Sequence, residues 1–223
     1  MPEVYPLLQF THILLFVYWL GADLGVFLAS KYVSRSDLTF DERRRFLELL
    51  LSLDMGPRTA LVMVIPTGTL MIWLAKWIEI RTDIAALIVT LSLFWLSLVW
   101  YLHRNSATHQ RWQQLDMGLR SAVVALMVLL GIRIVTGNLA EAPAWLGFKF
   151  LAYAGAVFCG IMLRRVLRIW ARGFRELSDT ATIEQGNIRI ASAAISASRY
   201  AVVLWMFVLL AAFFGVYKPI GVF

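Results

Sequence analysis

Six apolar stretches, each long enough to cross a lipid bilayer as a helix, dominate this chain of 223 residues. They cover residues 7–30, 58–77, 84–103, 119–136, 145–167 and 199–217. A membrane-spanning helix needs about 20 mostly apolar residues, because backbone polar groups in hydrocarbon must be satisfied within the helix itself. Apolar residues make up 60% of the chain. The sequence therefore predicts an all-α integral membrane protein with six transmembrane helices, forming a single helical domain over residues 1–223.

Positive charge alternates between the connections. The first, third and fifth connections carry clusters of Lys and Arg, whereas the second has Lys76 and Arg81 and the fourth, residues 137–144, has no cation. The positive-inside rule then places both termini outside, on the periplasmic side of a bacterial-type inner (plasma) membrane, and three basic loops in the cytoplasm. Basic loops beside anionic lipid account for the net charge of +7, so we expect the lipid bilayer as a partner and no nucleic acid.

Two of the cytoplasmic loops are long enough to fold. Thr39 and Glu42 match a capping box, and apolar residues at helical spacing follow them. This pattern predicts a short amphipathic helix that lies on the inner membrane interface. In the other loop, we expect the fifth span to extend beyond the membrane and residues 183–195 to form a second short helix.

A short motif repeats along the chain. The sequence DMGPR at residues 54–58 recurs as DMGLR at 116–120, and a weaker third copy begins at Arg199. Each copy stands where the chain re-enters the membrane from the cytoplasm, so we expect the six helices to form three related hairpins. The aspartates are expected to cap helix N-termini, and the arginines to anchor the helices at the interface.

The first span contains two ionisable residues, His12 and Asp23. Such residues are costly at membrane depth and are functional candidates by default. On a helical period, one face carries both of them together with two aromatic side chains: His12, Phe16, Trp19 and Asp23. Asp23 lies nearer the cytoplasmic half, where we expect it to form a buried ion pair with Arg58 or Arg120.

Small residues predict close helix packing in two places. Gly21 and Gly25 form a G-x-x-x-G patch in the first span, and Ala152, Ala156 and Gly160 line one face of the fifth. Such faces let helix backbones approach each other. They serve packing within one chain and association between chains equally well, so the sequence is compatible with a homo-oligomer or with a subunit of a larger membrane complex.

Three basic residues are expected at one level in the outer half of the membrane: His12, Arg133 and Lys149. His12 would lie about 8 Å below the outer end of its span. A neutral imidazole can bind haem iron, and basic side chains can pair with the propionates. Trp19 and Tyr153 would add ring surfaces beside a porphyrin. The alternative is structural, with His12 bridging two helices and the cations reaching toward the interface.

The remaining histidines and the cysteine narrow the choice of cofactor. His103 should lie about 20 Å from His12 along the membrane normal, and His109 is six residues further on, so both are interpreted as interfacial. Cys159 is the only cysteine, and no C-x-x-C-H motif exists for covalent attachment. Any haem would therefore be a single group that is held non-covalently.

Several short segments resemble one protein family. They are LQFTHI at residues 8–13, WLG at 19–21, PTGTLM at 66–71, AWLGFKF at 144–150 and VYKP at 216–219. They resemble segments of the HemJ-type membrane protoporphyrinogen IX oxidases and of the related CopD-like copper-resistance membrane proteins. The resemblance implies an oxidoreductase with bound haem b, with His12 as axial ligand and Lys149 at the site. HemJ-type proteins have four spans, and this chain has a third hairpin between about residues 82 and 136.

Three function hypotheses follow. The first is a haem-b membrane redox protein that oxidises a porphyrinogen or passes electrons between a small donor and the quinone pool. The second is a CopD-like transport protein for copper or another small solute. The third is a non-catalytic subunit of a larger membrane complex. They differ in what the purified protein should contain: a haem chromophore, stoichiometric metal, or neither.

Overall fold

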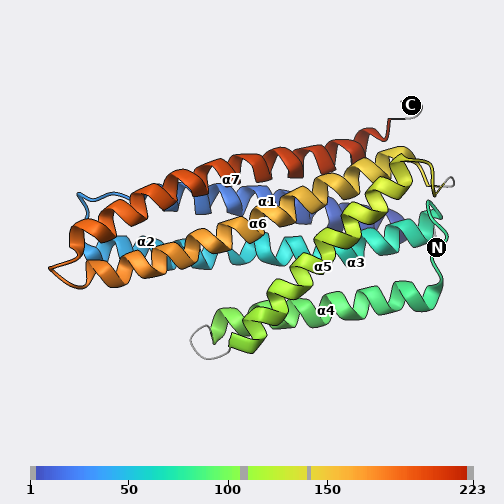
Figure 1. Cartoon of the computed structure of the whole chain (residues 1–223). Coiled ribbons are helices and arrows are strands. Elements are labelled where there is room, and N and C mark those ends of the chain that lie inside the picture. Colours follow the sequence, from blue (N-terminus) through green and yellow to red (C-terminus); the bar gives the residue numbers. More distant parts are fainter. Residues whose placement is uncertain (1–3, 106–109, 140–141, 220–223) are drawn as a thin grey trace.

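The computed structural model describes residues 4–105, 110–139 and 142–219, and these residues form seven helices (Figure 1). The helices are α1 (Val4–Val33), α2 (Phe40–Leu53), α3 (Met55–Ala75), α4 (Thr82–Arg104), α5 (Gln110–Val135), α6 (Ala144–Leu177) and α7 (Ile183–Tyr217). Within the described residues, six segments are long and apolar enough to cross a membrane, with α2 and α3 counted as one. Large apolar side chains such as Leu7, Leu87 and Phe213 are exposed on their outer faces. The prediction of an all-helical chain with six span-length helices is confirmed, and these faces are compatible with lipid contact.

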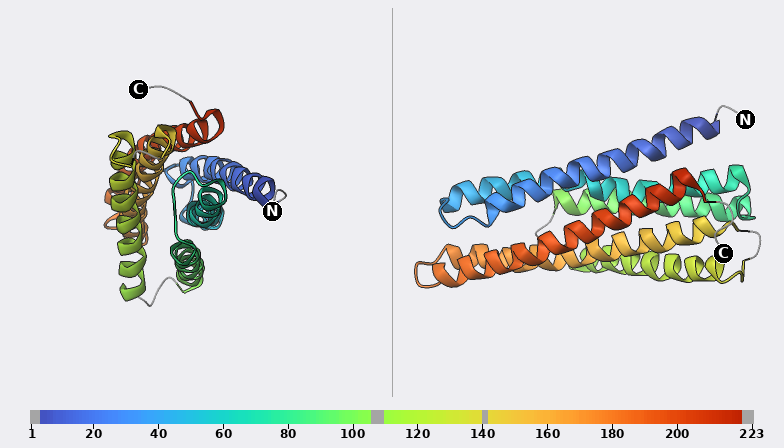
Figure 2. Two further views of the ribbon diagram at one scale, coloured as in Figure 1. Left: turned by 90° about the vertical axis from the view of Figure 1, so that its right-hand side faces the viewer. Right: turned by 90° about the horizontal axis from the view of Figure 1, so that it is seen from above.

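Apart from the short helix α2, the helices are arranged as two groups of three. In one group α3 packs against α1 and α4, and in the other α6 packs against α5 and α7. Figure 2 shows the two groups as two rows when the bundle is viewed along its length. The predicted arrangement as three hairpins is not confirmed. The middle hairpin would consist of α4 and α5, which meet at one end and separate toward the other (Figure 1).

The two ends of the bundle differ in how far the helices extend. The end of the bundle where α1 begins and α7 ends is called here the terminus end (Figure 1). At the other end, called here the α2 end, α6 and α7 continue further. These helices have 34 and 35 residues and so reach about 50 Å, against about 30 Å of hydrocarbon. The prediction of a separate helix at 183–195 is wrong, because α7 is continuous from Ile183.

An apolar core holds the α2 end together. Its buried side chains come from α1, α2, α6 and α7 and include Val33, Leu50, Trp170 and Ile190. Trp170 also donates a hydrogen bond from its indole nitrogen to the Ile190 carbonyl oxygen, 3.2 Å away. Burial of these large side chains fixes the extended part of α6 against α7 and α1.

Helix α2 begins at the predicted capping box and is part of the bundle. The Thr39 hydroxyl accepts a hydrogen bond from the Glu42 backbone N–H, and the Glu42 carboxylate accepts one from the Thr39 N–H. Arg43 is buried, with Nε donating to the Val33 carbonyl oxygen at 2.9 Å and Nη1 donating to Asn187 Oδ1 at 2.6 Å. These contacts tie α2 to α1 and α7, and the predicted position flat on the membrane interface is not confirmed.

Of the two glycines in the first span, only Gly25 is tightly packed, since a Cβ there would lie 3.2 Å from Leu53 Cδ1, and other glycines also make close helix contacts. A Cβ added at Gly56 would lie 2.8 Å from the Ala22 Cβ, so Gly56 is what lets α3 approach α1. A Cβ at Gly147 of α6 would lie 2.9 Å from the Gly131 carbonyl oxygen of α5. Gly21 is exposed, and a Cβ there would meet nothing within 4 Å. The expectation that Gly21 lies in a close helix contact is therefore wrong.

Candidate functional site

His12 on α1 is half-buried near the terminus end and is hydrogen-bonded to α3. Its Nδ1 lies 2.7 Å from Oγ1 of Thr67, and the same hydroxyl lies 2.9 Å from the Met63 carbonyl oxygen. A hydroxyl has one proton, so when Thr67 donates it to Met63, the Nδ1–H of His12 becomes the donor to Thr67. The lone pair of the neutral ring is then on Nε2, the nitrogen left for a metal ion.

Lys149 on α6 lies in the same part of the bundle and points toward α7. Its ammonium occupies the space beside Gly215, where an added Cβ would collide with Nζ. It interacts electrostatically with His12 and with Lys218. No Asp or Glu among the described residues forms an ion pair with it. The terminus end therefore brings together three basic side chains from α1, α6 and the end of α7.

Aromatic rings lie beside the ammonium group of Lys218, at the end of α7. Lys218 Nζ lies 4.7 Å from the ring centroid of Trp77 and 5.7 Å from that of Trp145. The two indoles meet edge to face with centroids 4.9 Å apart, and Tyr5 meets Trp77 in the same way at 6.2 Å. Cation–π attraction holds the ammonium over these rings. Helix periodicity did not identify this cluster, because it joins residues from four distant segments.

Trp19 and Tyr153 lie deeper in the bundle than His12. Trp19 is 4% exposed, about 10 Å further along α1, and its ring meets that of Tyr153 edge-on with centroids 6.3 Å apart. The Tyr153 hydroxyl donates to the Leu61 carbonyl oxygen at 2.7 Å. Both rings therefore pack in the core between α1, α3 and α6.

Arg133 and His103 are not brought to His12. Arg133 is exposed on α5, and Figure 2 shows α6 between α5 and α1. His103 lies half-buried in the last turn of α4 and meets Trp100 edge-on at 6.4 Å. His109 is outside the described residues. Among the residues that the structure describes, no group of three His, Cys, Asp or Glu side chains is placed to hold a metal ion.

A second group of ionisable residues lies midway along the bundle, centred on Asp116 of α5. Its carboxylate is fully buried. Oδ2 accepts hydrogen bonds from Arg120 Nε at 3.1 Å and Arg164 Nη1 at 2.7 Å, and Oδ1 accepts one from Trp95 Nε1 at 2.9 Å. Three donors from α4, α5 and α6 thus converge on one carboxylate.

The repeated motif forms ion pairs instead of helix caps. Asp54 makes no side-chain cap hydrogen bond to α3 and pairs with Arg58. Asp116 lies almost two turns inside α5, where no free backbone N–H remains to be capped. Arg120 is 2% exposed, so it is not an interfacial anchor. The first two copies of the motif therefore each place an aspartate and an arginine four residues apart on one helix face.

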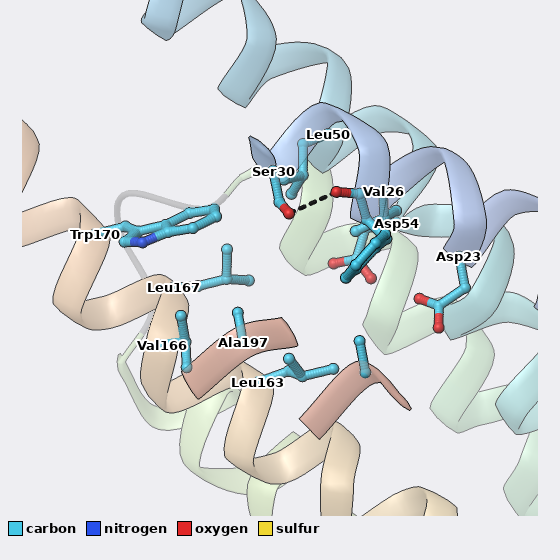
Figure 3. A pocket seen from close by; sticks show the side chains of 12 residues that line it. Asp23, Val26, Ser30, Leu50, Asp54, Leu163, Val166, Leu167, Trp170 and Ala197 are labelled. Atoms are coloured by element: carbon cyan, nitrogen blue, oxygen red, sulfur yellow. Dashed lines mark hydrogen bonds between the residues drawn. The ribbon is translucent and has the colours of Figure 1, made fainter. Parts of the chain in front are cut away.

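Asp23 does not form the predicted ion pair with Arg58 or Arg120. Its Oδ2 accepts a hydrogen bond from Trp205 Nε1 at 2.7 Å, which joins α1 to α7. The carboxyl group lines two adjoining cavities of about 70 Å³ and about 50 Å³. Figure 3 shows the larger one, with Asp23 and Asp54 at one side and Trp170 at the other.

No family model, no curated protein and no solved structure matches this chain. The resemblance to HemJ-type proteins therefore stays a prediction that depends on short segments. What the geometry defines is a helical chain with six span-length helices, a cationic cluster at the terminus end, and an Asp–Arg network midway along the bundle.

Proposed function

We propose that this chain is a membrane redox protein that binds haem b non-covalently, with His12 as the axial ligand. The observation that carries the proposal is the 2.7 Å contact between His12 Nδ1 and Thr67 Oγ1. A histidine that binds a metal almost always donates its other ring N–H to a fixed acceptor, which sets the tautomer and the ring orientation. Thr67 supplies such an acceptor within an apolar helix pair.

The charges at the terminus end fit the carboxylates of haem. Lys149 lies near His12 and Lys218 lies near Lys149, and no Asp or Glu of the described residues pairs with either lysine. An unpaired ammonium in apolar surroundings is costly, so a ligand carboxylate would be favoured there. The indoles of Trp77 and Trp145 provide apolar ring surface beside these cations.

Each residue then has a distinct role. Bound haem would supply one-electron chemistry at its iron. His12 would hold the iron, Thr67 would orient the imidazole, and Lys149 would orient a propionate. The resemblance to HemJ-type proteins supports oxidation of a porphyrinogen, and electron transfer between a small donor and the quinone pool uses the same site. The alternation of basic loops supports a bacterial-type inner membrane with both termini outside.

The first experiment is an absorption spectrum of the detergent-purified protein from cells supplied with haem precursor, before and after reduction with dithionite. We expect a Soret band that shifts on reduction in the wild type and is absent in His12→Ala. The matched control is His103→Ala, which removes a half-buried imidazole from α4 and should leave the spectrum unchanged. A colourless wild type, or a Soret band that persists in His12→Ala, would overturn the proposal.

The Thr67→Val variant tests the orienting hydrogen bond, because valine keeps the side-chain shape and removes the hydroxyl. Loss of a partner to a metal-bound histidine typically lowers affinity by about 10- to 100-fold, so we expect weaker haem retention during purification. Thr90→Val is the control, since the Thr90 hydroxyl bonds only to the Ala86 carbonyl oxygen on an exposed face of α4. Equal haem content in the two variants would show that the Thr67 hydroxyl does not support haem binding. Metal analysis of a colourless protein would then separate a CopD-like copper protein from a non-catalytic subunit.

A further inference from the structure

Asp23 of α1 carries a buried carboxyl group that the proposed haem site does not use. The residue is 7% exposed, and its Oδ2 accepts the hydrogen bond from Trp205 Nε1. The other two aspartates of this region, Asp54 and Asp116, are paired with arginines. No Lys, Arg or His of the described residues forms an ion pair with Asp23. Asp23 is therefore the aspartate of this region that can gain a proton without breaking an ion pair.

The two oxygens of this carboxyl group have different surroundings. Oδ2 faces the Trp205 indole, whose N–H is a donor only and can bond either a carboxylate oxygen or the carbonyl oxygen of a protonated acid. Oδ1 makes no hydrogen bond to a described residue and, unlike Nη2 of Arg120, remains accessible to a water molecule. Oδ1 is therefore the oxygen that can exchange a proton with water.

The larger of the two cavities that Asp23 lines lies between this residue and the α2 end. It has a volume of about 70 Å³ and reaches from Asp23 and Asp54 to Trp170 of the α2-end core (Figure 3). Ser30, which also lines it, is about 10 Å further along α1 than Asp23. A single water needs only about 15 Å³ on this measure, so the cavity has room for several waters, with two carboxyl groups and a hydroxyl as hydrogen-bond partners.

The charged groups that face Asp23 come from neighbouring helices. Those that line the smaller cavity with it are Asp54 and Arg58 at the start of α3, Arg120 of α5 and Arg164 of α6. The described residues of α2 and α7 that line the two cavities are uncharged: Leu50, Ala197, Ala201 and Leu204. With Asp116 included, three arginines face three aspartates. The group is thus neutral when Asp23 is ionised and carries one positive charge when Asp23 is protonated.

We propose that Asp23 is a proton-binding site that exchanges protons with the α2 end through waters in the larger cavity. In this step a hydronium ion transfers its proton to Asp23 Oδ1, which leaves a neutral carboxylic acid and a water molecule, and no electron is exchanged. In a membrane redox protein, such a group takes up the proton that accompanies an added electron. That use rests on the proposed function, whereas proton binding shares no residue with His12, Thr67 and Lys149 and is tested without haem.

The test is infrared difference spectroscopy of the haem-free protein in mixed micelles as the pH is lowered from mildly alkaline to mildly acidic. We expect a carboxylic acid C=O band that is absent in Asp23→Asn and retained in Asp83→Asn, which removes an exposed carboxylate. Trp205→Phe keeps Asp23 but removes the N–H that bonds Oδ2, so the band should shift to higher frequency. If no band depends on Asp23 or Trp205 while circular dichroism shows a folded protein, the proposal is wrong.

The route through the cavity is tested by the rate at which the same band shifts after transfer of the protein to D₂O. Ala197 of α7 lines the larger cavity and is buried, so Ala197→Leu fills part of the space without removing a polar group. Ala191→Leu, at an exposed position of the same helix, is the matched control. We expect slower exchange in Ala197→Leu and the wild-type rate in Ala191→Leu. An unchanged rate in Ala197→Leu would overturn the proposed route.

Discussion

The terminus end and the middle of the bundle differ in whether their charged side chains have partners of opposite charge. Around Asp116, the carboxylate is paired with Arg120 on its own helix and with Arg164 and Trp95 from neighbouring helices, and Nη2 of Arg120 is the one buried atom of these side chains without a hydrogen bond among the described residues. Around Lys149, basic groups from α1, α6 and the end of α7 come together, and no carboxylate of the described residues forms an ion pair with them. Paired charges belong to the fold, because removing one partner strands the other. Charges without a partner within the described chain are available to a ligand.

Asp116→Asn should have the largest effect on the free energy of unfolding. The variant keeps the side-chain shape but leaves the buried Arg120 and the half-buried Arg164 without their shared counter-charge. Breaking a buried ion pair on one side typically costs about 3–5 kcal/mol. The measurement is denaturant or thermal unfolding of the purified protein in mixed micelles, followed by circular dichroism.

The control for this variant is Asp83→Asn, which removes the carboxylate of an exposed pair. The side chains of Arg81 and Asp83 are 78% and 62% exposed, and such pairs contribute only about 0–1 kcal/mol. If the two aspartate variants had equal effects, the Asp116 network would not be the stabilising element that its burial suggests.

A smaller loss is expected for Trp205→Phe. This change keeps an aromatic ring against Phe27, whose centroid lies 5.2 Å from that of Trp205, and removes the N–H that donates to Asp23. A hydrogen bond to a charged group is typically worth about 1.5–3 kcal/mol. Trp100→Phe, at an exposed position of α4, controls for the change of ring. Should Trp205→Phe unfold with wild-type stability, the bond between α1 and α7 would contribute nothing.

The helices could be predicted from the sequence because apolar runs of span length leave little choice of structure. Their ends could not, since the extra turns of α6 and α7 are stabilised by packing at the α2 end and not by hydrophobicity alone. This uncertainty explains the error at Asp116. A span that begins at residue 119 puts it at a helix end, whereas α5 begins at Gln110 and places it inside the helix.

Hydrogen-bond partners that lie far apart in the sequence could not be predicted from helical spacing either. Helical spacing put His12 and Asp23 on one face, but Thr67 and Trp205 are 55 and 182 residues away from them. Thr67 looks like any threonine that bonds back to its own helix, so nothing local marks it as a partner of His12. Similarly, the apolar span predicted over residues 145–167 located Lys149 near one end of a helix without indicating that Gly215 leaves room for its ammonium.

Lys149→Met should have the smallest effect on stability and separates the two regions most sharply. Because no carboxylate of the described residues pairs with Lys149, replacing it strands no opposite charge, and methionine has a similar length. We expect the free energy of unfolding of the haem-free protein to change by less than about 1 kcal/mol, in contrast to Asp116→Asn. Haem retention should fall at the same time, since a propionate loses its cation. Lys76→Met, at an exposed position after α3, should change neither quantity. A loss of stability as large as that of Asp116→Asn would instead show that Lys149 is held in the fold by a partner of its own.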